Sequence, residues 1–216
     1  MESFVSFSLL ILLLTISTSV HGQSQEQKSL AFNGIKLPLD YKCIEGASTP
    51  FKVIPFSSGR MLVGVCNTLF MLDSKNRVAW KHAVMPMIID FAYVESTDLV
   101  YGTAEDGVFF IIQVSSGKVL ESSFINGTGD YGKVKTYKQD QCLVIFDNRG
   151  IREKYNDPLA QDELIAWRGT EFLWRIDFPI GAELIVNGDK ILAMTKIKDG
   201  IFVKEIEVPQ GKGVSK

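Results

Sequence analysis

The sequence has little histidine, and this shortage excludes much of the common chemistry of catalysis. Only His21 and His82 occur in 216 residues. A serine or cysteine nucleophile is normally activated by an imidazole that a third group orients. His82 lies beside Trp80 and Lys81, and no nucleophile motif is near it. We therefore expect no catalytic residue of this kind, which favours a protein that is not an enzyme.

A long hydrophobic run is also missing. The longest apolar stretch occupies positions 4–16. Crossing a bilayer takes roughly 20 residues, so this stretch is too short. Small and polar residues follow it, and Val20 and Gly22 stand three and one positions before the polar run that begins at Gln23. This layout predicts a cleavable signal peptide over residues 1–22. The mature chain is then secreted, extracellular or periplasmic, with no membrane anchor; an uncleaved anchor is the alternative.

An excess of charge of either sign is absent. Cleavage removes one acid, Glu2, and leaves 23 Lys and Arg residues against 24 Asp and Glu residues. A protein that binds nucleic acid usually has a basic face and a high pI, whereas the pI of this chain is about 5.8. We expect no nucleic-acid partner. The length and the 46% hydrophobic content suffice for one core.

Cysteine is scarce and odd in number. The sequence contains Cys43, Cys66 and Cys142. An oxidising compartment permits one disulfide among them, with one thiol left over, and the sequence does not choose the pair. Cys66 and Cys142 lie in strand-like runs, which favours small buried apolar residues at both positions. A glycosylation sequon at Asn126 applies if the host is eukaryotic.

The remaining pattern is that of β-strands. Residues 23–50 form a polar N-terminal arm, and from residue 51 onward short β-branched and aromatic runs alternate with turn sequences. The runs group into four units of four strands each. Repeats of this size are typical of propeller blades. The sequence predicts an all-β, propeller-like domain over 51–216, of four four-stranded antiparallel blades, with the units at 51–84, 87–124, 133–178 and 182–216.

Two segments carry a resemblance to a known family. The stretch LFMLDSKNRVAW, residues 69–80, has an Asp, a turn and a Trp in the order found in quinoprotein-type repeats, and FIIQVSSGKVLE, residues 110–121, has the Gly-Lys turn at Gly117 and Lys118. The chain resembles quinoprotein-like (PQQ-like, WD40-like) β-propeller repeat proteins. Val114 and Glu121 depart from the motif where the family has Asp and Trp.

The resemblance implies a fold more than an activity. Enzymes of that family hold a pyrroloquinoline quinone and a calcium ion at the centre of eight blades. Four units cannot build that ring, and no ligand motif is present, so the resemblance implies the non-enzymatic branch and no cofactor. Three geometries stay open: a small closed propeller, an incomplete ring, or a half-ring completed by a homodimer. The chain could equally be a remnant of a longer propeller.

Several side chains could form a site. Trp80 and Trp174 match packing positions between blades, whereas Trp167 precedes a turn and is the candidate for binding. His82, Met85 and Met87 lie close together, and imidazole and thioether ligands suit copper. This cluster supports an alternative function, an extracytoplasmic metal-binding or redox protein.

Paired acids give a second alternative, a carboxylate-dependent hydrolase. Glycoside hydrolysis requires two carboxyl groups that face each other across a cleft. The candidates are Glu105 with Asp106 and Asp162 with Glu163, although acids at such turns usually serve turn chemistry and solubility. The function we expect is instead a secreted, non-catalytic binding or assembly module. Its ligand is a protein or a carbohydrate, held by loops at one face.

Overall fold

The computed structural model describes residues 52–84, 87–124, 131–147 and 161–209, together with the backbone of 29–32 and 35–38. Within these ranges the regular structure is β-strand, apart from two short 3-10 turns, η1 (Glu95–Thr97) and η2 (Glu105–Gly107). No helix in the described part of the chain is long and apolar enough to cross a membrane.

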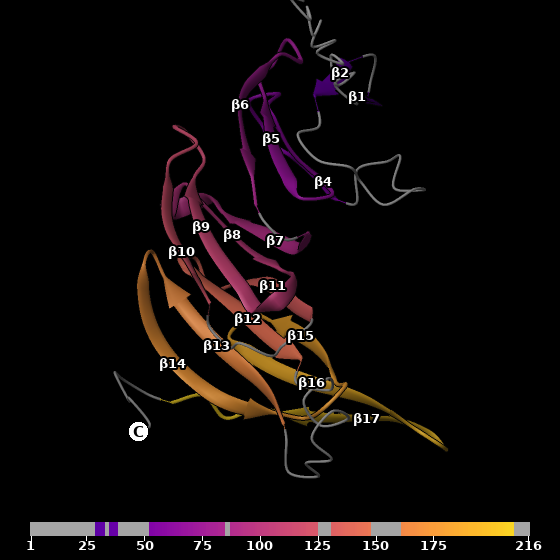
Figure 1. Cartoon of the computed structure of the whole chain (residues 1–216). Coiled ribbons are helices and arrows are strands. Elements are labelled where there is room, and N and C mark those ends of the chain that lie inside the picture. The colour runs from indigo at the N-terminus through magenta and orange to yellow at the C-terminus, as the bar shows by residue number, and fades with distance from the viewer. Residues whose placement is uncertain are drawn as a thin grey trace, which may run out of the picture.

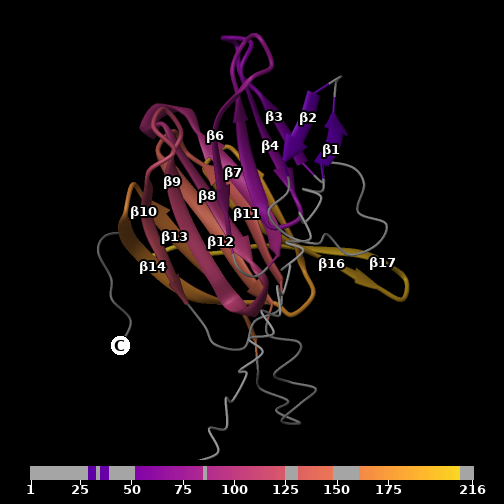
Figure 2. The same ribbon diagram turned by 45° about the horizontal axis from the view of Figure 1, so that its top comes forward.

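The strands form four antiparallel meanders, called blades here, and one separate hairpin. The hairpin pairs β1 (Ser29–Phe32) with β2 (Ile35–Pro38) and lies beside the first blade (Figures 1 and 2). The first blade contains β3 (Lys52–Pro55), β4 (Met61–Val65), β5 (Thr68–Leu72) and β6 (Val78–Ala83), and the second contains β7 (Ile88–Val94), β8 (Leu99–Ala104), β9 (Val108–Gln113) and β10 (Val119–Phe124). The third contains β11 (Tyr131–Tyr137), β12 (Gln141–Asp147), β13 (Asp162–Arg168) and β14 (Glu171–Phe178), and the fourth contains β15 (Glu183–Asn187), β16 (Lys190–Ile197) and β17 (Gly200–Glu205).

The blades stack face to face in chain order, as Figure 1 shows. The first strand of each blade lies toward the inside of the stack, where β11 is beside both β7 and β15. The predicted fold class, an all-β propeller-like arrangement of antiparallel blades, is confirmed. The fourth blade differs in one respect, because only three of its strands lie among the described residues.

Three hydrophobic layers hold the blades together. Because successive side chains of a strand point to opposite faces, each blade contributes one set of apolar residues to each neighbour. The first layer joins blades one and two around Leu69 and Phe110, the second joins blades two and three around Phe109 and Val144, and the third joins blades three and four. One blade alone would expose these faces to water, so burial between blades supplies the main stabilisation.

The motif residues of the first two blades pack as expected. Trp80 packs against the first layer, and its Nε1 donates a hydrogen bond of 2.8 Å to the carbonyl oxygen of Val114 in the second blade. Trp174 is 5% exposed and lies in the third layer. The predicted packing role of both tryptophans is confirmed.

Asp73 fixes the turn that follows β5. Its carboxylate accepts hydrogen bonds from the backbone N–H groups of Lys75 and Arg77, each at 2.9 Å, and forms an ion pair with the Arg77 guanidinium. The Arg77 backbone and side-chain hydrogen bonds lower the pKa of Asp73. The turn therefore keeps its shape without the Gly-Lys pair found in the family motif.

Two tyrosine hydroxyls bridge neighbouring blades. Tyr101 Oη in β8 donates to the carbonyl of Gly169 in the third blade at 3.1 Å, and Tyr137 Oη in β11 donates to the carbonyl of Asp189 in the fourth blade at 2.9 Å. Burial raises the pKa of Tyr101 to about 12. Buried hydroxyls that find a carbonyl acceptor avoid the cost of an unpaired polar group, so each tyrosine stabilises one blade interface.

The cysteines do not all behave as strand residues. Cys66 lies in the two-residue turn between β4 and β5 with a φ of 51°, and it is disulfide-bonded. Cys66 is buried, as expected, but its placement within a strand is wrong, because β4 ends at Val65. Cys142 is a buried free thiol within β12, as expected. Cys43 lies outside the described residues, and so does Asn126.

Candidate functional site

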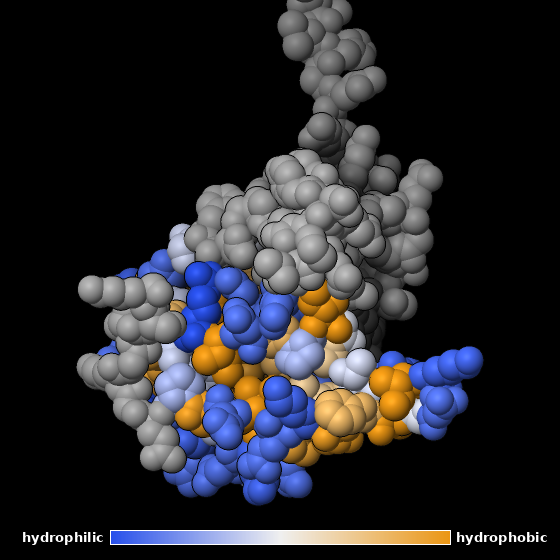
Figure 3. Space-filling model, turned by 90° about the horizontal axis from the view of Figure 1, so that it is seen from below, coloured by the Kyte–Doolittle hydropathy of each residue, from blue (hydrophilic) through white to orange (hydrophobic). Residues whose placement is uncertain are grey.

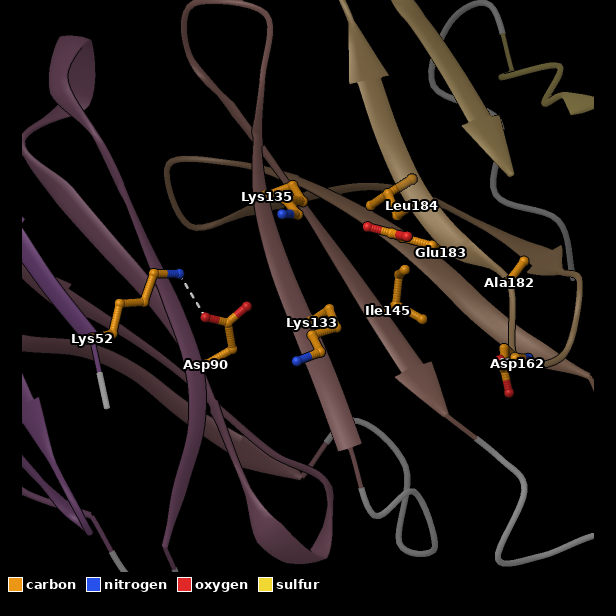
Figure 4. Close-up of a pocket in the computed structure, with 10 residues that line it drawn as sticks. Lys52, Asp90, Lys133, Lys135, Ile145, Asp162, Ala182, Glu183 and Leu184 are labelled. Atoms are coloured by element: carbon orange, nitrogen blue, oxygen red, sulfur yellow. Dashed lines mark hydrogen bonds and ion pairs between the residues drawn. The ribbon is translucent and has the colours of Figure 1, made fainter. Parts of the chain in front are cut away.

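The inner strands of all four blades line a cavity of about 750 Å³ near the axis of the stack (Figure 4). Most of its lining is charged, and the described lining residues include no aromatic side chain. β3, β7, β11 and β15 each contribute at least one residue. The cavity is lined by Lys52, Asp90, Lys133, Lys135, Ile145, Asp162, Gly181, Ala182, Glu183 and Leu184.

One wall of this axial cavity is an ion pair that joins three blades. Lys52 Nζ lies 2.6 Å from Asp90 Oδ1 and also donates to the carbonyl of Phe91. Asp90 Oδ2 accepts a hydrogen bond of 3.0 Å from the backbone N–H of Val134 in the third blade. Because the Asp90 side chain is only 13% exposed, the pair is fixed and partly shielded from water. The opposite charges of Lys52 and Asp90 cancel, so this pair offers little net charge to a ligand.

The neighbouring strand β11, which lies between Asp90 and Glu183 in Figure 4, holds two lysines without a partner among the described residues. Lys133 and Lys135 are two positions apart on β11, so their side chains leave the strand on the same face. Neither lysine forms an ion pair or side-chain hydrogen bond with another described residue. The Asp162 carboxylate, by contrast, is already engaged, because Asp162 is 2% exposed and accepts a hydrogen bond of 3.0 Å from the Gly181 N–H. The free charges of the cavity are therefore the two lysines and Glu183, which lies across from them in Figure 4.

Trp167, the predicted binding residue, does not line this cavity. Its ring stacks on Phe109 with the centroids 4.9 Å apart, and it meets the edge of Phe172 at 5.8 Å. It packs half-buried against the layer between blades two and three. The indole N–H is buried and has no acceptor among the described residues. This environment indicates a packing role.

Two of the three predicted soft-metal residues, His82 and Met87, lie in the described part of the chain. His82 is half-buried on β6 opposite Leu69, and burial lowers its pKa. Met87 is half-buried just before β7, and Met85 lies outside the described residues. In the described ranges no three His, Cys, Asp or Glu side chains gather in a way that could bind a metal. His82 lies outside the axial cavity.

The predicted acid pairs do not face each other. Asp162 and Glu163 are consecutive residues of β13, so their side chains point to opposite faces of the sheet. Glu163 forms an ion pair with Arg175 at 2.9 Å. Glu105 and Asp106 lie in the turn η2, where Asp106 has a φ of 58°. Neither pair spans a cleft in the way that glycoside hydrolysis requires.

Sequence reasoning missed the residues that do converge. Lys133 and Lys135 lie in the segment KVKTYK, and their spacing of two places them on one face of a strand. That pattern could have marked a basic strand face. Nothing in the sequence showed that this face lines the axis, since the position depends on contacts of β11 with β7 and β15.

No protein-family model matches the sequence, and no curated protein is similar to it in sequence. Solved structures are similar in fold. The WD40 domain of coronin from Toxoplasma gondii gives a TM-score of 0.54 at 12% identity, over 69% of this chain and 40% of the other. Hydrazine synthase from Kuenenia stuttgartiensis gives 0.54 at 11% identity, over 77% and 49%.

BamB from Moraxella catarrhalis is a third similar structure, with a TM-score of 0.50 at 10% identity over 71% of this chain and 45% of the other. The chain spans less than half the length of each of these three structures. WD40 repeats build β-propellers, so the likeness shows a propeller fold. At this identity it shows the fold alone.

Proposed function

We propose that this chain is a secreted, non-catalytic β-propeller-like module that binds an extended acidic segment of a partner protein in its axial cavity. The observation that carries the proposal is the pair Lys133 and Lys135, which project from one strand face into the cavity without a partner among the described residues. Alternate residues of an extended chain lie about 7 Å apart. Two acidic residues separated by one position therefore match the spacing of the two lysines.

The character of the lining favours a protein segment over a carbohydrate or a small molecule. Pockets for small ligands are mostly lined by apolar and aromatic side chains, whereas six of the ten described lining residues here are Lys, Asp or Glu and none is aromatic. Charged groups in a binding surface mainly give orientation, specificity and a faster association rate. The self-neutralised pair of Lys52 and Asp90 would form a fixed wall, and the free lysines would contact the ligand.

Two features support secretion. Residues 1–22 have the composition of a signal peptide. Cys66 is disulfide-bonded, which is typical of proteins that fold in an oxidising compartment. Cys142 is free, so we propose Cys43 as the partner of Cys66. The N-terminal arm would then be attached to the first blade by a covalent bond.

Fluorescence anisotropy tests the binding site. The probe is a labelled peptide of alternating glutamate and serine, and the matched ligand replaces each glutamate with glutamine. We expect the acidic peptide alone to bind, and more weakly as salt rises. The double variant Lys133→Gln with Lys135→Gln should weaken binding by about three- to tenfold, the range expected for two exposed charge pairs.

A control variant distinguishes binding at the axial cavity from nonspecific attraction of the acidic peptide to positive charge on the protein surface. Lys75→Gln with Lys118→Gln removes two exposed lysines from turns of the first two blades. This variant should bind the acidic peptide as the wild type does. Equal weakening by both double variants, or no binding of the acidic peptide at low salt, would refute the proposed site.

Expression of the full chain in a eukaryotic cell tests secretion. We expect protein in the medium whose first residue is Gln23 and whose mass falls after treatment with an N-glycosidase, because of a glycan on Asn126. The variant Asn126→Gln controls for the glycan. An intracellular product that retains residues 1–22 would contradict secretion.

A further inference from the structure

The fourth blade has one apolar face that the other described residues leave exposed. Register places Met194 beside Val203 and Ile185 beside Leu192, so these side chains share a face with Ile201. Ile201 is 60% exposed and Val203 is 50% exposed. On the opposite face Leu184, Ile191 and Ala193 are buried against the third blade, whereas Ile197 and Phe202 near the end of the hairpin are each 55% exposed. The open face is defined as Ile185, Leu192, Met194, Ile201 and Val203.

Figure 3 shows this end of the molecule. Hydrophobic side chains gather there between hydrophilic ones, and the patch continues onto the projecting hairpin of β16 and β17. All six residues of β17 are exposed. Exposed apolar patches of this kind on a protein surface usually mark an interaction site.

The other end of the stack is different. The central strands of the first blade, β4 and β5, are buried on both faces: Leu62 and Leu69 pack toward the second blade, and Val63 and Phe70 on the reverse face are 0% exposed. A ring closed head to tail requires the open face of one chain to pack on a free face of the first blade of another. Among the described residues, the central strands of the first blade offer no such free face, and only Val53 and Val78 on its outer strands are exposed large apolar residues.

We infer that two copies of this chain associate through their open faces about a two-fold axis. Each blade interface already in the fold is an apolar sheet face packed on another apolar sheet face, and the open face continues that series. A second copy supplies a matching surface in its own open face. A two-fold interface is built from the same patch on both partners, so it needs no second type of surface.

The charges around the open face permit this self-association. Lys190 and Glu205 form an ion pair at 2.8 Å, and Lys196 adds one positive charge on the same face. Glu183 shares this face by register but also lines the axial cavity. The face therefore carries little net charge, and repulsion between two copies is small. The inference differs from a half-ring completed head to tail, because the first blades remain at the outer ends of the dimer.

Light scattering of the secreted protein over a series of concentrations tests the inference. We expect a dimer that dissociates on dilution. Ile201→Lys with Val203→Lys should convert it to a monomer without changing its circular dichroism, since both side chains are exposed. The control is Val78→Lys on β6, an exposed valine of the first blade that is 37% exposed, and it should remain dimeric.

Cross-linking distinguishes the two-fold arrangement from other dimers. The variant Val203→Cys is expected to form a disulfide with the same position of the second copy, because equivalent residues near a two-fold axis meet. The variant Val78→Cys should give no cross-linked dimer. A wild-type monomer at every concentration, a dimer that survives both lysine substitutions, or cross-linking of the Val78→Cys variant alone would each overturn the inference. Loss of peptide binding in the axial cavity would not affect it.

Discussion

Gly117 of the second blade lies directly against the indole of Trp80 from the first. A Cβ atom added to Gly117 would lie 2.7 Å from Trp80 Cγ and 2.9 Å from Cδ2, closer than real side chains approach. The same turn provides the Val114 carbonyl that accepts the Trp80 N–H bond. The Trp of one blade and the Gly of the next blade's turn therefore form a single contact, which joins the two segments that resemble the family motif.

The variant Gly117→Ala is expected to destabilise the protein more than Gly169→Ala. Both glycines have a left-handed backbone, with a φ of 70° at Gly117 and 56° at Gly169. A residue with a Cβ costs about 1–2 kcal/mol in that conformation. Nothing lies within 4 Å of a Cβ at Gly169, whereas a Cβ at Gly117 also forces Trp80 to move. Such overpacking adds about 1–3 kcal/mol.

Urea denaturation of both glycine variants measures the difference in the free energy of unfolding. Equal destabilisation would show that the Trp80 contact contributes nothing.

Cys142 is predicted to be unreactive until the protein unfolds. Burial raises the pKa of its thiol well above the usual range, so the reactive thiolate is scarce in the folded protein. A colorimetric thiol reagent should detect no free thiol in the native protein and one per chain after unfolding without a reductant. Three thiols after unfolding would mean that Cys66 is not in a disulfide, and one thiol before unfolding would contradict the burial of Cys142.

Acid should destabilise the protein through His82. Burial lowers its pKa below the ordinary 6.5, so the unfolded chain binds a proton more readily than the folded chain. Above pH 6.5 both states are neutral and the full stability is present. The free energy of unfolding then falls as the pH drops from 6.5 through the folded-state pKa.

The proposed cleavage before Gln23 would remove His21 and leave His82 as the one histidine of the chain, which makes the measurement direct. A proton NMR titration of the folded protein should give a single imidazole pKa below 6.5. The variant His82→Gln should lose the part of the acid destabilisation that belongs to this residue. A measured pKa at or above 6.5 would contradict the role given to burial.

Most of the fold followed from patterns that are local in the sequence. Short runs of β-branched and aromatic residues predicted the strands, and turn sequences separated them, because both depend on near neighbours. The position of Cys66 was predicted wrongly for a local reason as well. The apolar run RMLVGVC continues through it, and only the pairing of Val65 with Thr68 shows that the strand has already ended.

The candidate site could be predicted much less well. Trp167 was selected because it precedes a turn, yet its ring stacks on Phe109, a residue of the preceding blade. The acid pair Asp162 and Glu163 looked suitable as two neighbouring carboxylates, although strand geometry sends them to opposite faces. Lys52, Asp90 and Lys133 are far apart in the sequence, and no local pattern connects them.

By itself, the sequence determined the strands, their turns, the grouping into four units and the contact surfaces of Trp80 and Trp174. These depend on side-chain periodicity and on residues that only certain turns accept. The tertiary structure alone decided which strand lies nearest the axis and that Lys133 and Lys135 line a cavity with Asp90. It also decided that the central strands of the first blade are buried on both faces while the fourth blade leaves one face open. Those features arise from packing between blades, where residues distant in the chain meet, and burial between sheets has no signature within any one strand.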